Sequence, residues 1–325
     1  MRLWRRIRAW MSSSSAFPRG TPISDNAQPS PGIEQLLHVL GQQAWRKETR
    51  HPPESFLLAP STLKQGADTT ALEANLRMLY EHARRWAPGL SVPYKVPRVS
   101  LTRALAHPGQ YTVDSAGWVA IDVSAELASR APMLSVILAH EVCHHILDLT
   151  ELDDKRDRAR TERMTDLAMF ICGFGDIVSH GCTSIQQTAS GYVRTHLGYL
   201  EPCDYDYAYV WVLGARVANG LPGMRGSQAV RVAMTTSLRL PDPMECLQRV
   251  LAHRILDRRV RERVIRHYAT RSPQETAEHI LQHILEDYAR EEALTEAAGM
   301  NEPGYKNHPT PKLLTPQQIA RINKS

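Results

Sequence analysis

Three residues whose side chains can do metal chemistry lie together near the middle of the chain: His140, Glu141 and His144, in the pattern His-Glu-x-x-His. They fall inside the apolar run 133–149, which has helical spacing. Side chains four residues apart share one face of a helix, so the two imidazoles can bind one zinc ion. Glu141 stands beside them and can reach a water on that ion as a general base. The pattern therefore predicts a catalytic zinc site.

The two histidines leave a zinc ion one ligand short, because catalytic zinc sites use three protein ligands and a water. Leu147 and Thr150 stand where metzincin peptidases place a glycine and a third histidine, which excludes that class. A carboxylate on the following helix is the alternative, and Glu162 follows His144 after 17 intervening residues. Asp166 lies one turn after Glu162 on the same face. We predict that Glu162 binds the metal and that Asp166 accepts the free imidazole N–H of a ligand histidine.

The combination of His-Glu-x-x-His with Glu-x-x-x-Asp on the next helix resembles the gluzincin zinc peptidases, the clan that includes thermolysin. Thr-Asp-Leu-Ala and Gly-Phe-Gly within residues 162–175, with Gly-Tyr-Leu at 198–200 and Tyr-Ala-Tyr at 207–209, further resemble a family of uncharacterised bacterial gluzincin-like proteins. That family is usually named only for its motif. The resemblance covers roughly residues 94–218 and implies a zinc cofactor and peptidase chemistry, but no particular substrate.

The resemblance also implies roles for single residues. Glu141 would take a proton from zinc-bound water and later deliver it to the leaving amine. Gluzincins commonly add a downstream tyrosine or histidine that donates to the oxyanion, and the candidates are Tyr199, Tyr207, Tyr209 and His180. We select Tyr209, because it lies on a predicted helix where the resemblance continues. A packing role for this tyrosine is the alternative.

Some neighbouring residues are expected to stay outside the chemistry. His145 follows the second ligand but points about 100° away from it on a helix, which predicts a packing or surface histidine. Cys143 receives no role. Cys172, Cys182 and Cys203 lack Cys-x-x-Cys spacing and are predicted to be buried thiols.

Hydrophobic periodicity places the predicted site in a mostly helical chain. Apolar residues at helical spacing predict helices at 33–45, 71–86, 133–149, 159–172, 205–218, 244–269 and 273–298. Short β-branched and aromatic runs between proline and glycine residues predict strands at 97–102, 110–113 and 118–123. We therefore expect an α+β fold in which a small antiparallel sheet precedes a zincin-type active-site helix and a helical C-terminal extension follows.

The last predicted strand, 118–123, is expected to form the edge of the sheet, where it would pair with an extended peptide substrate. Its residues alternate, and Val119, Ile121 and Val123 form an apolar face that should meet the core. A strand covered on both sides by its own neighbours is the alternative.

Composition divides the chain into four parts. Residues 1–31 form a basic segment predicted to be disordered, and residues 32–240 are expected to form the zincin-like catalytic domain. A helical C-terminal extension is expected at 241–299, and a flexible, proline-containing tail at 300–325. A transit peptide or a membrane-surface helix is the alternative for the N-terminal segment.

The whole chain has the composition of a globular protein, with 325 residues, 42% of them hydrophobic, and a net charge of +5. No apolar run reaches the roughly 18 residues of a spanning helix. The arginine-rich stretch 249–266 has no interleaved aromatic residues, which favours a solvated surface over a nucleic-acid site. Five cysteines without regular spacing fit a reducing compartment, and we expect a cytoplasmic protein.

The sequence thus predicts a zinc-dependent metallopeptidase that acts on a peptide or protein substrate, with no nucleic-acid partner and no integral membrane segment. It leaves the oligomeric state open. The alternative is a catalytically silent zinc protein with a regulatory or interaction role, and a third interpretation is a nucleic-acid-binding regulator built on the arginine-rich helix. Glu141 separates the first two, because a purely structural zinc site needs no general base.

Overall fold

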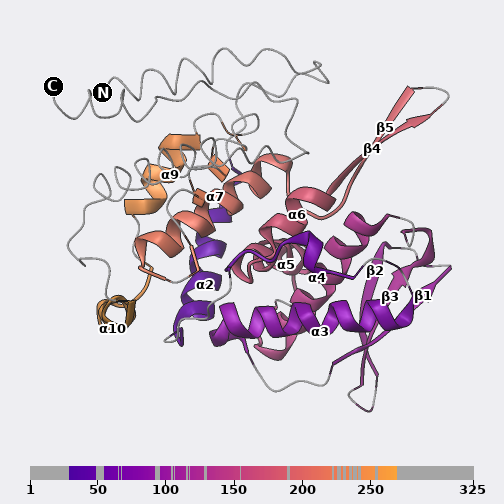
Figure 1. Ribbon diagram of the computed structural model, residues 1–325, viewed down its shortest axis with the longest axis horizontal. Helices are drawn as coiled ribbons and strands as arrows, with labels where there is room; N and C mark the ends of the chain where they lie inside the picture. Colours follow the sequence, from indigo (N-terminus) through magenta and orange to yellow (C-terminus); the bar gives the residue numbers. More distant parts are fainter. Residues whose placement is uncertain are drawn as a thin grey trace, which may run out of the picture.

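The computed structural model describes residues 29–268, apart from 49–54, 65, 67, 92–95, 104, 106, 115, 117, 128–129, 154, 189–190, 222, 225–227, 230–231, 234–235, 237–239, 241–242 and 253–254. This part of the chain is mostly helical, with one three-stranded sheet and one two-stranded hairpin (Figure 1). The predicted α+β class is confirmed at this level. The predicted helix 273–298, the tail 300–325 and nearly all of the N-terminal segment 1–31 lie outside the described residues.

Two helices precede the sheet. Helix α2 (Ile33–Trp45) has its predicted bounds, and helix α3 (Thr69–Trp86) begins two residues before its predicted start. Helix α3 begins there because Asp68 accepts a hydrogen bond from the Ala71 backbone N–H at 2.9 Å, which satisfies one free donor of the first turn. Short 3-10 turns lie beside these helices at η1 (Pro60–Thr62) and η2 (Pro88–Leu90).

The sheet is mixed, and the prediction of an antiparallel sheet is wrong. Strands β1 (Arg98–Thr102), β2 (Gly109–Val113) and β3 (Val119–Ser124) lie in the order β1-β3-β2. Strands β2 and β3 form an antiparallel hairpin, while β1 pairs in parallel with the other side of β3. Strand β3 is therefore central, and the prediction that it is an edge open to a peptide is also wrong.

The composition of β3 explains its central position. Ile121 and Val123 are 0% exposed, and the half-buried Val119 shares their face, so the predicted core-facing set is confirmed. The most apolar strand removes the most apolar surface from water when a neighbouring strand covers each of its two edges. The more polar strands β1 and β2 supply that cover.

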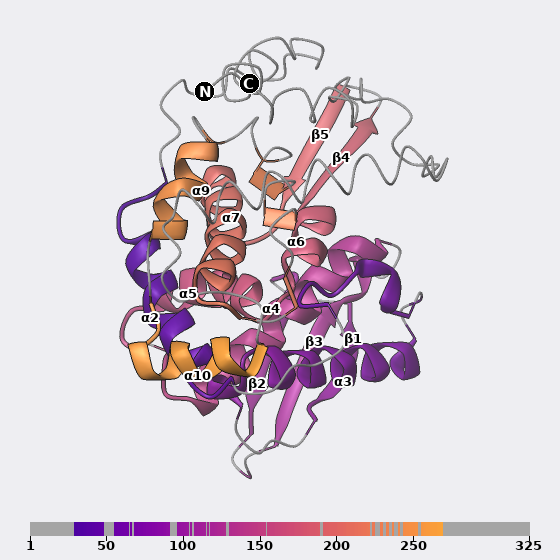
Figure 2. The same ribbon diagram turned by 60° about the vertical axis from the view of Figure 1, so that its left-hand side comes forward.

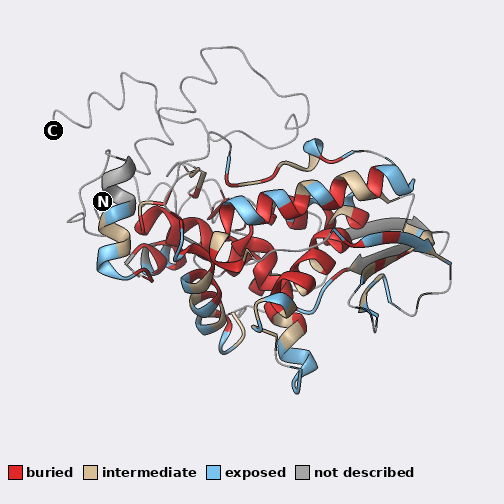
Figure 3. Ribbon diagram, turned by 90° about the horizontal axis from the view of Figure 1, so that it is seen from below, coloured by how far each residue is buried: buried red, intermediate tan, exposed pale blue. Residues whose placement is uncertain are grey.

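Two packed helices follow the sheet. Helix α4 (Ala131–Leu149) begins after the 3-10 turn η3 (Ala125–Leu127), and helix α5 (Arg158–Ile171) returns beside it. Helix α4 is buried around most of its circumference, as the apolar run 133–149 predicts. Figure 3 shows that buried residues, drawn in red, gather along the inner helices of the described chain. Helix α5 begins at Asp157, whose side chain accepts a hydrogen bond from the Arg160 backbone N–H at 2.9 Å.

Three elements in the middle of the chain were not predicted. They are helix α6 (Gly175–Gly181) and the antiparallel strands β4 (Thr183–Thr188) and β5 (Gly191–His196). Figure 2 shows the β4–β5 hairpin projecting from the helical body. The β4 sequence Thr-Ser-Ile-Gln-Gln-Thr has a single strongly apolar residue, so hydrophobic periodicity carried no strand signal there.

Helix α7 (Pro202–Ala218) packs against helices α2 and α5, and every one of its residues from Asp204 onward is buried. The single predicted helix 244–269 is in fact two helices, α9 (Pro243–Ala252) and α10 (Arg258–Tyr268). Between them Leu256 is buried, and its backbone N–H donates to Asn219 Oδ1 at 3.2 Å. None of the helices in the described part of the chain is long and apolar enough to cross a membrane.

A buried ion pair joins Glu48, just after helix α2, to Arg216 of helix α7. Arg216 is 0% exposed and Glu48 is 3% exposed, and two guanidinium N–H groups donate to the carboxylate at 2.7 and 3.2 Å. The guanidinium carbon lies 5.3 Å from the ring centroid of Trp45, 4.0 Å from that of Phe56 and 5.2 Å from that of Trp86. A buried charge of this kind is tolerated because its partner and the three ring faces replace water.

Candidate metal centre

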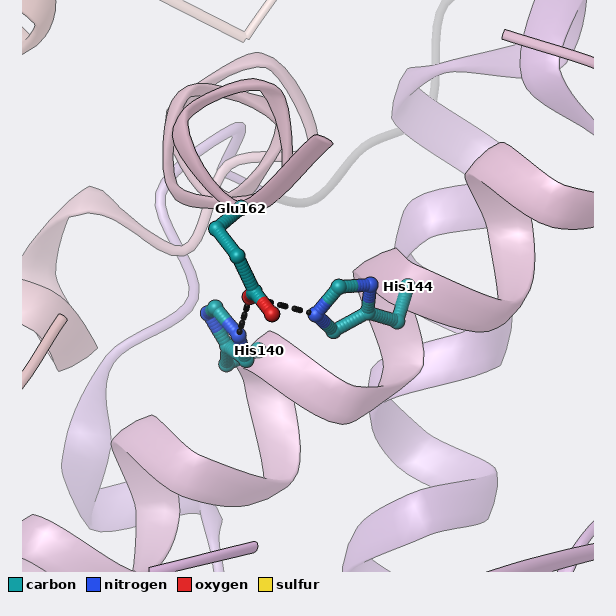
Figure 4. Close-up of side chains that lie close together, drawn as sticks. All are labelled: His140, His144 and Glu162. Atoms are coloured by element: carbon teal, nitrogen blue, oxygen red, sulfur yellow. Dashed lines mark hydrogen bonds and ion pairs between the residues drawn. The ribbon is translucent and has the colours of Figure 1, made fainter. Parts of the chain in front are cut away.

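Helices α4 and α5 bring the three predicted metal ligands together. His140 and His144 extend from α4 and Glu162 from α5, and one ligand atom of each lies within 4.8 Å of the others (Figure 4). Glu162 Oε2 is 2.9 Å from His144 Nε2 and 3.4 Å from His140 Nε2. The side chains of the two histidines are 13% and 18% exposed, and that of Glu162 is 9% exposed. The three residues form a group that could hold a metal ion.

Asp166 lies directly behind the first histidine. Its Oδ1 is 2.9 Å from His140 Nδ1, and because Asp166 pairs with His140 while Glu162 pairs with His144, the two helices run antiparallel. The other oxygen, Oδ2, accepts the Tyr199 backbone N–H at 2.6 Å and the Tyr205 hydroxyl at 2.7 Å. A fully buried carboxylate surrounded by donors keeps the His140 proton on Nδ1 and leaves Nε2 free to bind a cation.

Thr165 does the same for the second histidine, although no motif in the sequence marked it as a site residue. Its hydroxyl donates to the Thr161 carbonyl at 2.9 Å, so its oxygen can accept the N–H of His144 Nδ1 at 3.2 Å. Its spacing could have identified it, because Thr165 lies one turn after Glu162 on the same face of helix α5. Both imidazoles therefore have their Nδ1 atoms engaged and their Nε2 atoms directed at Glu162.

A second unpredicted residue is Arg158, one turn before the carboxylate ligand. Its Nε is 3.4 Å from Glu162 Oε1, while its side chain is 78% exposed. The contact is an i,i+4 pair on the first turn of α5 between an exposed guanidinium and a largely buried carboxylate. It places an exposed positive charge beside the candidate site.

The site is electrostatically suited to a cation. Burial alone would lower the pKa of His140, but its hydrogen bonds to Asp166 and Glu162 outweigh burial and raise that pKa to about 10. Burial would raise the pKa of Glu162, but the hydrogen bonds from His140 and His144 hold it well below the usual range. Without a metal, the imidazole of His140 therefore stays protonated beside the Glu162 and Asp166 carboxylates, and a metal cation can take the place of that proton.

Glu141 lies between the ligand histidines and the sheet. It is 5% exposed, and burial raises its pKa more than the nearby imidazoles of His140 and His144 lower it. The backbone of Tyr111 on β2 acts in the opposite direction to burial and lowers that pKa. A Cβ atom at Gly109 would lie 2.5 Å from Glu141 Oε1, so strand β2 passes directly against this carboxylate.

The four candidate oxyanion donors lie in different environments. The hydroxyl of Tyr209, the residue selected from the sequence, donates to Asp176 of α6, and the side chain is 7% exposed. Tyr207 accepts a hydrogen bond from Arg249 at 3.3 Å, and Nδ1 of His180 lies 2.7 Å from the Asp176 carbonyl oxygen. Those three side chains are engaged by partners outside the metal-binding group.

Tyr199 differs from the other candidates. Its ring stacks on His140, with ring centroids 5.8 Å apart and planes inclined by 25°, and the residue is 52% exposed. Burial, together with the charge of Glu162, raises the pKa of the Tyr199 phenol. Tyr199 is therefore the candidate whose ring the structure places on the metal-binding group, and its backbone is fixed there by Asp166.

His145 is a packing residue, as predicted. It is 2% exposed, its Nδ1 lies 2.6 Å from the Tyr80 hydroxyl, and its ring stacks on Tyr111 at 5.5 Å between centroids. Cys143 and Cys172 are both fully buried free thiols, and burial raises the pKa of the Cys143 thiol well above its usual value. A thiol held protonated in this way is inert.

Two histidines one turn apart and a carboxylate from the next, antiparallel helix form a His-His-Glu group that could hold a metal ion. No family model matches the chain, and neither a curated protein nor a solved structure is significantly similar to it.

Proposed function

We propose that the protein is a zinc-dependent metallopeptidase of gluzincin type. The observation that carries the proposal is the position of Glu141, a buried carboxylate between two histidines whose Nε2 atoms converge on Glu162. A general base beside a metal site with three protein ligands is the arrangement used for metal-assisted hydrolysis.

Zinc is the metal that suits this donor set. Two imidazole nitrogens and one carboxylate oxygen are common ligands of catalytic zinc, which keeps a fourth position for water or substrate. The engaged Nδ1 atoms of His140 and His144 fit zinc as well, because ligand histidines usually donate their second N–H to an acceptor. When bound, zinc would supply Lewis acidity that polarises a peptide carbonyl and makes a nearby water more acidic.

The chain's own residues would move the protons. Glu141 would take a proton from the attacking water and later deliver it to the nitrogen of the leaving amine. Asp166 and Thr165 would hold the two imidazoles in the productive tautomer. The Tyr199 hydroxyl would donate to the carbonyl oxygen as negative charge develops there, a role that we transfer from Tyr209 because the Tyr199 ring lies on His140.

A catalytically silent zinc protein with a regulatory role is the second candidate. The burial of Glu141, at 5% exposure, favours it, because a base that substrate and water cannot reach would do no chemistry. The two candidates differ in what happens when Glu141 loses its charge.

The deciding experiment compares the wild-type protein with Glu141→Gln on a fluorogenic peptide library. For a peptidase we expect Glu141→Gln to retain zinc and fold and to lose cleavage by about a hundredfold or more, because the amide cannot accept the proton. Glu126→Gln, on the 3-10 turn before α4, is the matched control and should cleave like the wild type. Equal cleavage by Glu141→Gln and wild type would remove Glu141 as the base, and a zinc-loaded wild type that cleaves no library member would favour the silent protein.

A further inference from the structure

The metal-binding group is not closed off from solvent. The side chains of its two histidines, His140 and His144, are 13% and 18% exposed. Two residues that touch the group are far more exposed: Tyr199, at 52%, stacks on His140, and Arg158, whose side chain is 78% exposed, contacts Glu162. A ligand that reaches the group from solvent therefore meets an aromatic ring and a guanidinium.

Helix α5 fixes the position of Arg158. This arginine is the first residue of the helix and directly follows Asp157, whose side chain caps the first turn. It stands one turn before Glu162, so the two side chains extend from the same face. The backbone that carries the guanidinium is thus held beside the metal-binding group by a regular helix and not by a loop.

The contact between Arg158 and Glu162 uses only part of each side chain. Arg158 Nε lies 3.4 Å from Glu162 Oε1, while the two histidines share the other oxygen, Oε2. Within the described part of the chain, the two terminal NH₂ groups of Arg158 have no hydrogen-bond partner. Their N–H bonds form a planar fork that matches the two oxygens of a carboxylate.

Neighbouring cations differ from Arg158 in their contacts or their direction. Lys155 pairs with Asp148 at 3.1 Å, and Arg163 donates to a backbone carbonyl at 3.5 Å. Arg160 is exposed but lies two residues after Arg158, so it points to a different face of α5. Arg158 thus combines available donors with a position on the metal-binding group, which none of these neighbours does.

The charge of Arg158 also reaches the phenol of Tyr199. Burial raises the pKa of this phenol, the charge of Glu162 raises it further, and the charge of Arg158 lowers it. Tyr199 is the residue that we propose to contact the reacting carbonyl oxygen. A substrate group bound by Arg158 would therefore lie close to that carbonyl.

We infer that Arg158 is a specificity-determining residue that selects peptides with a carboxylate close to the bond that is cleaved. The carboxylate can belong to an acidic side chain or to the free C-terminus of the peptide, since both present the same two oxygens to the guanidinium. The inference rests on the proposed function, because it names the substrate class of that site. Charge-assisted hydrogen bonds of this kind contribute roughly tenfold to a hundredfold in affinity.

The first test measures binding without cleavage, on zinc-loaded Glu141→Gln protein. Fluorescence anisotropy follows labelled alanine hexapeptides that carry one glutamate at each position in turn, with matched glutamine peptides, each made with a free and with an amidated C-terminus. We expect a carboxylate to tighten binding about tenfold or more, and this advantage to disappear when Arg158→Gln is added. A preference lost with glutamine identifies an acidic side chain, and one lost on amidation identifies the C-terminus. Equal affinity for all peptides, or no binding of any, would overturn the inference.

Further variants separate recognition from a structural role. Arg158→Glu should reverse the preference, so that lysine peptides bind more tightly than glutamate peptides, because the charge at the site is inverted. Arg160→Gln is the matched control and should keep the preference of the parent protein, and zinc content should be unchanged in every variant. If Arg158→Gln weakens the binding of acidic and amide peptides equally, the arginine only supports Glu162 and the inference is refuted.

The second test uses cleavage of the same peptides by protein that retains Glu141. We expect Arg158→Gln to lower kcat/KM for carboxylate-bearing peptides about tenfold or more and to leave it within about twofold for their amide counterparts. Arg158-dependent binding in a protein that cleaves nothing would leave the carboxylate site standing and refute the proposed function. Equal cleavage of acidic and amide peptides by the wild type would refute the inference and leave the proposed function standing.

Discussion

Nδ1 of His140 lies 2.9 Å from Oδ1 of Asp166, a carboxylate with no exposed surface. The same carboxylate accepts the Tyr199 backbone N–H and the Tyr205 hydroxyl, so three donors from three parts of the chain meet on one side chain. The orientation of the His140 imidazole is therefore set by residues far from it in sequence.

One zinc ion should bind each chain through the two histidines and Glu162. We expect native mass spectrometry to show one zinc in wild type and none in His144→Ala or Glu162→Ala, because a site with two ligands left binds weakly. His180→Ala, on the exposed end of α6, serves as the control and should retain the ion. Equal zinc in His144→Ala and wild type would contradict the ligand assignment.

Asp166→Asn should weaken zinc binding while leaving all three ligands in place. An asparagine offers one acceptor and one NH₂ group where the native site presents three donors, so either His140 or Tyr205 loses its partner. We expect a 10- to 100-fold loss of affinity, the usual effect of removing an acceptor behind a ligand histidine. Competition with a chromophoric chelator measures it, and Asp176→Asn, which alters the Tyr209 contact, should leave the affinity unchanged.

The stability of the metal-free protein should fall in mild acid because of His145. Burial lowers the pKa of this imidazole from 6.5 to about 4, so the folded state binds fewer protons than the unfolded state between these values. Its contribution is fully present above pH 6.5 and is lost as the pH falls toward 4, on the order of 3 kcal/mol in total. Urea unfolding of wild type and His145→Phe at pH 7, 5 and 4 tests this, and a difference between the two proteins that does not change with pH would refute it.

Gly198→Ala should disturb the metal site from outside it. Gly198 has a φ of +102°, and a Cβ there would collide with the Tyr205 hydroxyl and lie 2.9 Å from Asp166 Oδ2. We expect a loss of about 2 kcal/mol or more in the free energy of unfolding, together with weaker zinc binding. Gly32→Ala separates the two causes, because Gly32 also has a positive φ, of +85°, but nothing lies within 4 Å of its Cβ position. If both variants lose equal stability and neither loses zinc, backbone strain alone is responsible.

The sequence was most informative where one short-range rule decides the structure. Helical spacing placed His140 and His144 on one face and set the bounds of α2 and α4 to within two residues. The shared face of Glu162 and Asp166 followed from the same rule. These inferences required no knowledge of how distant segments pack.

Contacts between segments far apart in the sequence were harder to predict. Nothing in the alternation of residues 118–123 shows that β1 pairs with the second side of β3, since that depends on how the β2–β3 hairpin lies against the earlier strand β1. For a similar reason, the sequence did not distinguish the environment of Tyr199 from that of Tyr209. Tyr199 reaches the site through a short segment after an unpredicted hairpin, whereas Tyr209 sits on a regular helix whose orientation the sequence does not fix.

The ion pair of Arg216 and Glu48 has a consequence for cooperativity. The guanidinium contacts Trp45 at the end of α2, Phe56 in the following segment and Trp86 at the end of α3, while Arg216 itself lies on α7. Replacing Glu48 with alanine would leave this charge buried among the three rings without its partner, at a cost of about 3 to 5 kcal/mol. Helices α2 and α3 should accordingly unfold as one unit with helix α7. We expect a single unfolding transition, which helices α4 and α5 share.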